Sequence, residues 1–419
     1  MIIPANFKQF SKIAVSFGLV ALVGVLTVLS SMLIGRFYGP SGLGLYATVI
    51  SIGQILGTLC GTSVGTYAIT KLPALIREQD SHQEHFMFRL SLLTIIFTST
   101  ATTILFIFLH SSTEFILLLL ISASIIAHSV QNYSRDILRC HGAIVRSYFV
   151  LITTNSITIA SISIFNVVLD KSVSIKTILL PALAATIIIA LFVITKSSFF
   201  NGRDFLHYLG NLKTSKRPLK IRDAKDAAKV FLPMIVASVA QVTLAKTDIL
   251  IASKFGSITL AGELTASVSI ASIAIMGLAA LNAIYVPRIN AASKKNANSI
   301  LREVQKMGAI LTIVASVSIY SFDTQILNLF GFDSKDSILA LRILLVGAVI
   351  NALTGPVIFV GLRISNGKPV AMTLGAAVIV NIVGDILVFN TYGIVGLAFV
   401  TALVSSATNL AIFMLVIRE

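Results

Sequence analysis

Ionisable residues are rare inside the long apolar stretches of this sequence, so the few that occur there are the first candidates for chemistry. Lys246 and Asp248 stand in "QVTLAKTDILIAS", and Asp385 stands in "NIVGDILVF". A charge is costly to bury among apolar side chains, so such residues usually pair or bind a proton or an ion. All three are therefore candidates for coupling to a proton or sodium ion. A structural salt bridge would explain the aspartates equally well, and Lys246 could instead direct its ammonium group outwards.

The spacing of these residues predicts which of them share a helix face. Lys246 and Asp248 are about 200° apart on a continuous helix, so they cannot both face one lumen. Asn381 lies one helical turn before Asp385 on the same face, which predicts a polar contact in the interior.

Amides near the middle of apolar stretches are a second group of candidates. An unpaired amide in hydrocarbon costs several kcal/mol, so each must find a partner. Interhelical hydrogen bonds would satisfy them, as would a water-filled cavity suited to the hydroxyl groups of a sugar. The amides are Gln54, Asn155, Gln241, Asn351 and Asn381.

Four arginines flank the ends of apolar stretches and form a third group. Arg36 would lie at the outer mouth of a lumen, and Arg146, Arg288 and Arg363 at the inner mouth. The planar guanidinium fork binds phosphate oxygens well, so these residues are candidates for binding a diphosphate.

Signatures of enzymes and metal sites are absent from the sequence. His82 and His85 lie three residues apart in "HQEH" without a nearby third ligand, so we expect no metal site there. There is no phosphate-binding lysine loop for direct use of ATP. Cys60 and Cys140 are expected to be incidental thiols. We expect neither catalytic residues nor a cofactor, apart from a coupling proton or sodium ion.

Composition predicts an all-α integral membrane protein. The 419 residues are 56% hydrophobic and 12% charged, with a mean hydropathy of +0.93. Apolar runs recur that are long enough to cross a bilayer, about twelve in all. They lie near 13–35, 43–69, 90–109, 114–131, 145–166, 175–195, 230–252, 262–286, 306–322, 337–361, 370–389 and 393–416.

The net charge of +15 is distributed unevenly between the loops. If the N-terminus is cytoplasmic, about four times as many Lys and Arg residues lie on the inner side as on the outer side. This bias predicts cytoplasmic termini and explains the positive charge without a nucleic-acid partner.

Two halves of the sequence repeat one another across the basic segment 196–229. "GRFYGPSGLGLYAT" follows the first span, and "SKFGSITLAGELTAS" follows the seventh. Further echoes pair Pro73 with Pro287 and Arg139 with Arg363. We therefore predict an N-terminal six-helix bundle (1–195), a cytoplasmic linker (196–229) and a C-terminal six-helix bundle (230–419). Parallel repeats of this kind are typical of alternating-access transporters.

Glycines recur every four residues in the second span, at Gly53, Gly57, Gly61 and Gly65. Such a ladder lets another helix approach closely. It indicates either static helix packing or a smooth face on which helices slide.

Two stretches resemble a known family. "RFYGPSGLGLYA" resembles the first loop of polysaccharide-biosynthesis transporters in the multidrug/oligosaccharidyl-lipid/polysaccharide (MOP) exporter superfamily. "FLPMIVASVAQVTLAKTDILIASKFGS" is similar to their seventh span and following loop. The span number, half symmetry and loop motifs extend this resemblance over nearly the whole chain. Within the superfamily, the sequence resembles Wzx-type O-antigen flippases.

The resemblance implies two bundles forming a V around a central cationic cavity. It also implies a cargo of undecaprenyl-diphosphate-linked oligosaccharide, flipped from the inner to the outer leaflet of the bacterial inner membrane. Other membrane proteins of polysaccharide assembly would then be partners. The alternative is a multidrug exporter of the same superfamily, coupled to H⁺ or Na⁺. A membrane enzyme of polysaccharide synthesis is disfavoured, because the outer loops are short and the first of them lacks a carboxylate.

Overall fold

The structure is a computed structural model that describes residues 5–77, 81–109, 114–140, 144–168, 174–195, 221–291, 294–332, 334–362 and 367–418. These residues are almost entirely helical, and no strand occurs among them. The α-helices are α1 (Ala5–Arg77), α2 (Ser81–Leu109), α3 (Phe115–Cys140), α4 (Ile144–Ser163), α5 (Ile175–Thr195), α7 (Ile221–Leu244), α8 (Thr247–Ile251), α9 (Ile258–Ala291), α10 (Lys294–Ser321), α11 (Asp323–Asn328), α12 (Lys335–Thr354), α13 (Val357–Gly361) and α14 (Lys368–Arg418). Two π-helical segments are η1 (Ile164–Val168) and η2 (Ala252–Gly256).

Eight of the described helices are long and apolar enough to cross a membrane. Two of these, α1 and α14, fold back at glycines whose positive φ angles, 68° at Gly39 and 53° at Gly393, would strain other residues. Each therefore supplies two spans. The bent pair α7–α8 and the shorter apolar stretch Leu93–Phe108 account for the remaining predicted spans in the described part of the chain. The predicted all-α, multi-pass membrane fold is confirmed.

The chain divides into two compact units. Unit 1 contains Met1–Ser51, Ile162–Ile175 and Thr243–Glu419, and unit 2 contains Ile52–Ser161 and Lys176–Val242. The assignment of residues 1–195 and 230–419 to two six-helix bundles stays a prediction. In the predicted linker, residues 196–220 lie outside the described part, and α7 already begins at Ile221.

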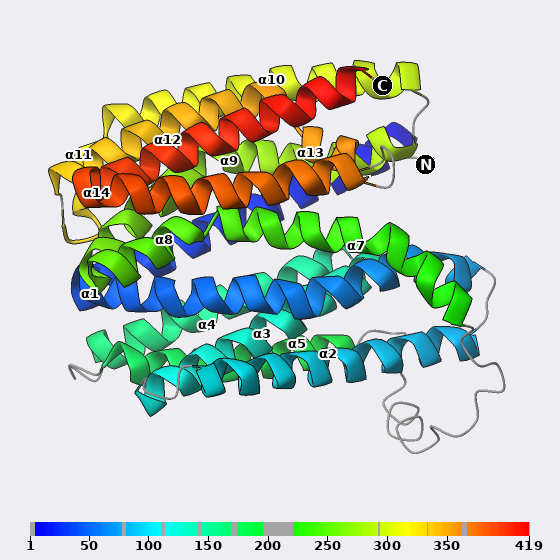
Figure 1. Cartoon of the computed structure of the whole chain (residues 1–419), viewed down its shortest axis with the longest axis horizontal. Helices are drawn as coiled ribbons and strands as arrows, with labels where there is room; N and C mark the ends of the chain where they lie inside the picture. Colours follow the sequence, from blue (N-terminus) through cyan, green and yellow to red (C-terminus); the bar gives the residue numbers. More distant parts are fainter. Residues whose placement is uncertain are drawn as a thin grey trace. The chain divides into compact units, whose positions relative to one another are not determined.

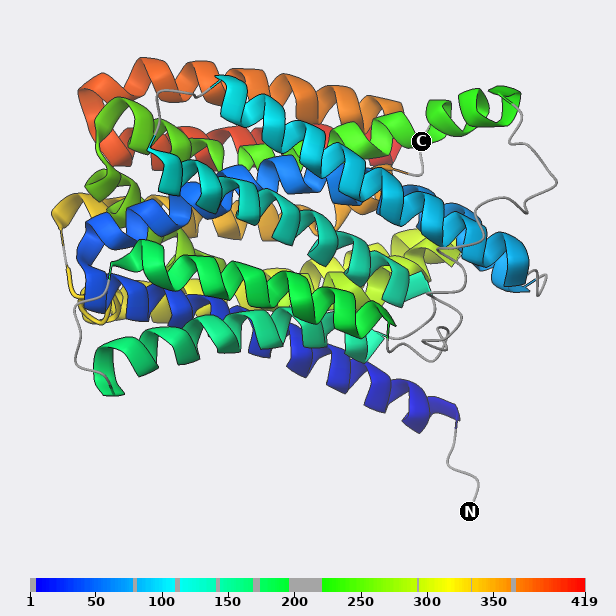
Figure 2. The ribbon, with the colours of Figure 1, turned by 90° about the horizontal axis from the view of Figure 1, so that it is seen from below.

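In unit 1, α9, α10, α12 and α14 pack along one another as neighbouring helices (Figure 1). The short helix α11 lies at one end, together with the bends of α1 and α14, at the left of Figures 1 and 2. We call this end of unit 1 the α11 end. Both chain termini lie at the opposite end in the two views, as expected for an even number of spans. The charge bias predicts that the α11 end faces away from the cytoplasm.

The seventh predicted span is broken. Stretches Leu232–Leu244 and Thr247–Gly256 meet at an angle of 51°. Ala245 and Lys246 form the turn between them, and Lys246 has φ and ψ angles of −129° and −13°. The estimate that Lys246 and Asp248 point about 200° apart assumed one continuous helix, so it does not apply across this break.

The glycine ladder of α1 packs on α3 inside unit 2. A Cβ atom added at Gly53 would lie 1.9 Å from Ser124 Oγ, and one added at Gly61 would lie 2.3 Å from the Ser129 carbonyl oxygen. Gly57 and Gly65 face His128 and Asp136 on the same helix. The ladder thus lies in a close helix–helix contact within one unit, which favours static packing over sliding between the halves.

Candidate functional site

Two carboxylates and one amide form a buried cluster in unit 1, which we call the carboxylate cluster. Asp248 is 1% exposed, Asn381 1% and Asp385 0%. Asn381 Nδ2 donates to Asp385 Oδ2 at 2.8 Å, which confirms the polar contact predicted from their spacing. Asp385 is also close enough to Asp248 for their charges to interact.

The broken span positions Asp248. Because α8 starts afresh after the turn at Lys246, Asp248 lies in its first turn, where backbone N–H groups lack helical partners. The N–H of Ile249 donates to Asp248 Oδ1 at 2.8 Å. Helix α8 packs on α14, and Ile249 belongs to the same buried apolar cluster as Phe389 and Leu397. Apolar packing therefore holds the carboxylate-bearing helices together.

Several oxygens of this region are buried without a hydrogen-bond partner among the described residues. They include Asn381 Oδ1, Asp385 Oδ1 and Thr401 Oγ1, all on α14. Buried polar atoms normally have partners, so unsatisfied ones call for an explanation. Carboxylate, amide and hydroxyl oxygens are the donor set of hard cations, and neighbouring carboxylates also share protons. The oxygens of Asn381 and the aspartates therefore fit a proton or sodium ion.

Sequence reasoning missed Thr401, because hydroxyl residues are common in membrane helices and nothing marks one as unsatisfied. Lys246, the third predicted coupling residue, is half-buried at the turn before Asp248. No group of three His, Cys, Asp or Glu residues in the described ranges could hold a metal ion.

The interior of unit 2 has a different chemistry. Gln131 Nε2 donates to Thr154 Oγ1 at 3.5 Å, and Asn132 Nδ2 donates to Thr58 Oγ1 at 3.4 Å. We call these four residues the amide–hydroxyl group. The predicted amides Gln54, Asn155 and Gln241 are half-buried and also belong to unit 2. Sequence reasoning missed Gln131 and Asn132, because they lie at the predicted end of the fourth span.

Asn351 has interhelical partners. Its Nδ2 donates to Ser405 Oγ at 3.1 Å, and its Oδ1 accepts from Asn409 Nδ2 at 3.0 Å. These bonds join α12 to α14 within unit 1 and satisfy the amide without cargo. Asn351 therefore fits the helix-packing interpretation of the amides.

The structure describes the side chains of two of the four predicted arginines. Arg36 is exposed in α1, and Arg146 is exposed near the start of α4. Arg288 lies in α9, but its side chain is outside the described part, and Arg363 is wholly outside it. A role of the arginines in cargo binding stays a prediction.

The two copies of the repeated motif meet at the α11 end. A Cβ atom added at Gly44 would lie 1.7 Å from the carbonyl oxygen of Ile258, and one added at Gly262 would lie 1.8 Å from that of Pro40. Gly44 thus faces the carbonyl of the residue four positions before Gly262, and Gly262 faces the carbonyl of the residue four positions before Gly44. We call this reciprocal backbone contact the glycine crossing. It brings the two copies of the motif into backbone contact and leaves no room for a side chain between α1 and α9 at these positions.

Comparisons with known proteins agree with this fold. Residues 233–387 match the MatE family. A structure described as lipid II flippase MurJ in an inward closed conformation has a TM-score of 0.70 at 16% identity, covering 97% of this chain and 87% of the other. An outward-facing multidrug resistance MATE family transporter of the MOP superfamily has a TM-score of 0.69 at 15% identity, covering 97% and 95%. A MOP superfamily transporter from Pyrococcus furiosus has a TM-score of 0.58 at 15% identity, covering 97% and 95%. No curated relative matches the sequence. At these identities the structural matches show a shared fold.

Proposed function

We propose that this protein is a transporter, not an enzyme, that moves a lipid-linked oligosaccharide across the bacterial inner membrane by alternating access. The fold is shared with a lipid II flippase and with multidrug transporters, so the fold alone does not choose the cargo. The observation that favours an oligosaccharide is the amide–hydroxyl group of unit 2, whose four side chains are polar and uncharged. Amides and hydroxyls match the donors and acceptors of sugars.

The proposed cargo is an undecaprenyl-diphosphate-linked repeat unit of O-antigen or a similar polysaccharide. Its headgroup carries about two negative charges and cannot cross hydrocarbon alone, because burying an unpaired ion is too costly. Arg36, Arg146, Arg288 and Arg363 would bind the diphosphate at the two mouths. An inside-negative potential drives an anion outwards by about 2.3 kcal/mol per charge per 100 mV.

Alternating access requires that one side be closed while the other is open. The glycine crossing supports a closed state at the α11 end, because backbone carbonyl oxygens only 1.7 and 1.8 Å from where a Cβ atom would stand leave no room for a side chain. In the proposed cycle this contact separates to release cargo. The predicted topology, with cytoplasmic termini, makes it the outer gate.

The carboxylate cluster is the proposed coupling site. Asp248 and Asp385 would bind a proton or a sodium ion, with Asn381 as a further oxygen donor. Lys246, at the turn before Asp248, would bias the occupancy of the site through its positive charge. Ion binding in unit 1 would then change the stability of the break between α7 and α8.

Leaflet-specific labelling of lipid-linked sugars in a gene-deletion strain tests this function. The proposal predicts that repeat units accumulate on the inner leaflet and that surface polysaccharide is lost. Other membrane proteins of polysaccharide assembly would be candidate partners in the intact pathway. A deletion that leaves both pools unchanged would contradict the proposal.

The second candidate is a cation-coupled multidrug exporter. It is favoured by the match of residues 233–387 to the MatE family and by the buried pair Asp248 and Asp385, which could attract a cationic drug. It predicts that the deletion strain becomes sensitive to cationic drugs while its surface polysaccharide is normal. The same strain therefore separates the two candidates.

A further inference from the structure

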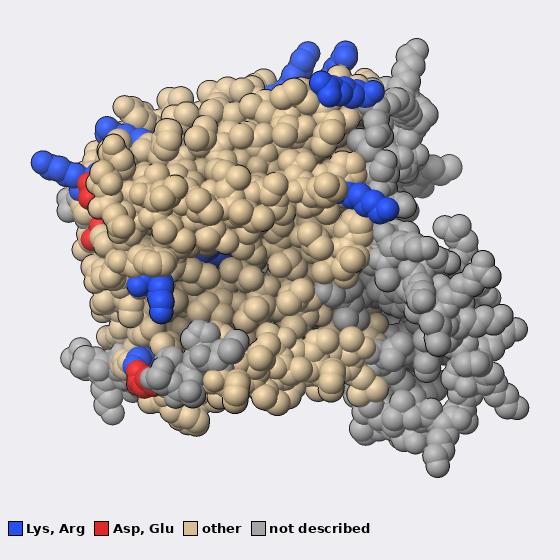
Figure 3. Space-filling view, in the orientation of Figure 1, with Lys and Arg blue, Asp and Glu red and all other residues tan. Residues whose placement is uncertain are grey.

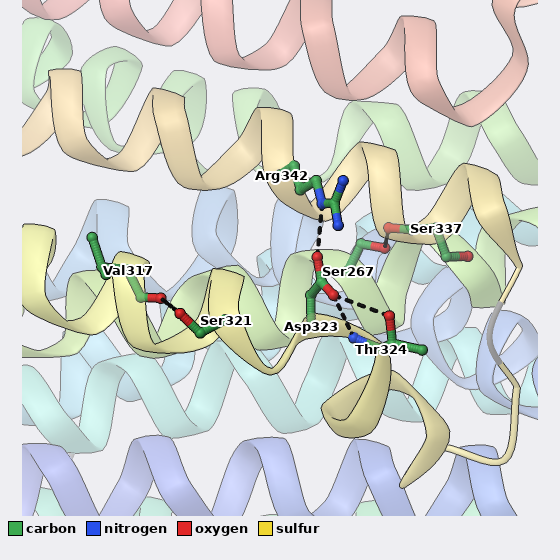
Figure 4. Close-up of polar contacts among 7 residues, drawn as sticks. All are labelled: Ser267, Val317, Ser321, Asp323, Thr324, Ser337 and Arg342. Carbon is green, nitrogen blue, oxygen red and sulfur yellow. Dashed lines mark hydrogen bonds and ion pairs between the residues drawn. The ribbon is translucent and has the colours of Figure 1, made fainter.

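Arg342 lies on α12 near the α11 end, where only one edge of its guanidinium group is bound. Its Nε–H donates to Asp323 Oδ2 at 2.7 Å, and its Cζ atom lies 4.9 Å from the centre of the Tyr320 ring. Figure 4 shows this single hydrogen bond to the guanidinium group. Among the described residues, its two terminal nitrogens have no hydrogen-bond partner. They remain able to donate to a ligand.

The partner of Arg342 is itself fixed. Asp323 is 4% exposed, and its Oδ1 accepts hydrogen bonds from the backbone N–H and the hydroxyl group of Thr324 (Figure 4). Burial raises the pKa of Asp323, but the hydrogen bonds from Arg342 and Thr324 outweigh this and hold the pKa below its ordinary value. The carboxylate therefore stays charged and keeps the guanidinium group in one orientation.

Hydrogen bonds also fix the start of α12. Ser267 Oγ donates to the Ser337 carbonyl at 2.8 Å (Figure 4), and Ser334 Oγ donates to Glu263 Oε2 at 2.7 Å. Both bonds join α12 to α9. Arg342 is thus presented from a helix that is anchored on two sides, by α9 and by α11.

An exposed apolar strip leads away from the guanidinium group towards the middle of the bundle. On α12 the strip contains Val346 (61% exposed) and Leu353 (56%), and on the adjacent helix α10 it contains Val317 (60%) and Ile310 (62%). On α12, Val346 lies 4 residues after Arg342, and Leu353 lies 7 residues after Val346. On α10, Val317 lies 3 residues before Tyr320, and Ile310 lies 7 residues before Val317. These spacings keep each row on one helix face. From Arg342 to Leu353 the strip is about 16 Å long, which is about half the hydrocarbon core.

We propose that this strip binds one phospholipid of the leaflet at the α11 end. The phosphodiester accepts from the terminal nitrogens of Arg342, and one acyl chain lies along the strip. Guanidinium binds phosphate oxygens through parallel donors, and the exposed tyrosine ring suits the membrane interface. This lipid site is separate from the carboxylate cluster and does not depend on the proposed cargo.

The surrounding charges select the class of lipid. Asp323 balances Arg342, and Asp336 and Glu263 balance Lys335 and Arg36, whose backbone adjoins Gly331 between α11 and α12. In Figure 3, blue and red side chains occur together at the left end of the view, and the band over α10 to α14 is largely uncharged. These charges leave no positive excess, which disfavours a diphosphate or an anionic lipid at this site. This balance suits a single phosphodiester whose headgroup also carries an ammonium group, as in phosphatidylethanolamine.

Lipid retention by the whole purified chain tests this site. The protein is reconstituted in nanodiscs with equal amounts of phosphatidylethanolamine and phosphatidylglycerol, extracted in mild detergent and analysed by native mass spectrometry. We expect one retained phosphatidylethanolamine and an about tenfold loss of it in Arg342→Gln, since a charged hydrogen bond is removed. Arg302→Gln, an exposed arginine on α10, is the matched control and should retain the lipid.

A second variant covers the case in which Arg342→Gln does not fold. Val317→Trp fills the strip without touching the pair of Arg342 and Asp323, and it should also lose the lipid. Equal retention by the wild type and Val317→Trp would overturn the proposal. Preferential retention of phosphatidylglycerol, or of an added polyprenyl diphosphate, would overturn the assigned lipid class and show that Arg342 recognises another phosphate.

Discussion

The two units bury their polar groups in different arrangements. Two buried carboxylates lie near one another in unit 1, whereas Asp136, a buried carboxylate of unit 2, lies 3.6 Å from Arg135. Unit 1 buries Asp248 and Asp385, whereas the amide–hydroxyl group of unit 2 contains Gln131, Asn132, Thr58 and Thr154 and carries no charge. The two units therefore do not carry the same buried chemistry. A buried carboxylate responds to a cation, while amides and hydroxyls offer neutral hydrogen bonds. The difference suggests a division of labour, in which unit 1 couples transport to an ion and unit 2 contacts the sugar.

The largest expected effect follows from neutralising the carboxylate cluster. Asp385→Asn removes a charge while keeping the shape of the side chain, so the ion should bind at least about 100-fold more weakly. Transport by reconstituted vesicles should then lose its dependence on the proton or sodium gradient. Gln131→Asn in unit 2 is the control and should keep that dependence. Gradient dependence that survives in Asp385→Asn at normal expression would remove Asp385 from the coupling role.

The next largest effect is expected from substituting leucine for a glycine at a close helix contact, with one such glycine in each unit. In Gly61→Leu a side chain would meet the Ser129 backbone inside unit 2, so the protein should lose more than about 3 kcal/mol of stability or fail to fold. Gly44→Leu would meet the Ile258 carbonyl at the glycine crossing. If the crossing opens during transport, Gly44→Leu should fold and favour the open state, because separation relieves the clash.

Thiol labelling from outside intact cells measures this difference. A cysteine placed at Ser257, beside the crossing, should react faster in Gly44→Leu than in the wild-type background, with Cys60 and Cys140 replaced in both. Equal labelling rates in the two folded proteins would show that the crossing is not a gate.

The sequence predicted part of the carboxylate cluster for a local reason. Asn381 and Asp385 are four residues apart on one helix, and this spacing alone brings them together. The geometry of Lys246 and Asp248 could not be predicted in this way, because the turn at Ala245 has no proline or glycine to mark it. The all-α membrane fold was predictable because apolar run length reflects bilayer thickness directly.

Contacts between distant segments explain what the sequence left open. The glycine ladder predicted a close helix neighbour, but only tertiary packing identifies that neighbour as α3. For Asn351 the sequence left helix packing and a water-filled cavity open, because its partners, Ser405 and Asn409, lie more than fifty positions further along the chain. Hydrogen bonds of this kind depend on which helices are adjacent, and helix adjacency is not encoded in local periodicity.

A smaller effect should follow from changing the amide–hydroxyl group. Gln131→Ala removes the donor to Thr154 and, if the sugar is bound there, one or two hydrogen bonds to cargo. We expect the KM for lipid-linked sugar to rise about tenfold, with the gradient dependence unchanged. Thr154→Val should act in the same direction. A lost gradient dependence in either variant would contradict the division of labour between the units.

The smallest expected effect concerns Thr401, and it distinguishes the two coupling ions. Its hydroxyl oxygen is buried without a partner among the described residues, in the part of α14 that follows the bend at Gly393, whereas Asn381 and Asp385 precede that bend. A sodium ion could gain an oxygen ligand from Thr401, whereas a proton shared by carboxylates would not need it. Thr401→Val keeps the shape of the side chain, so apparent sodium affinity should fall about fivefold if the hydroxyl is a ligand.

Ser406→Ala is the matched control, because Ser406 Oγ on the same helix is likewise buried without a partner in the described part of the chain. Transport driven by sodium should therefore weaken in Thr401→Val and not in Ser406→Ala. Unchanged sodium dependence in both variants would exclude Thr401 as a ligand, and dependence on a proton gradient alone would assign the carboxylate cluster to proton coupling.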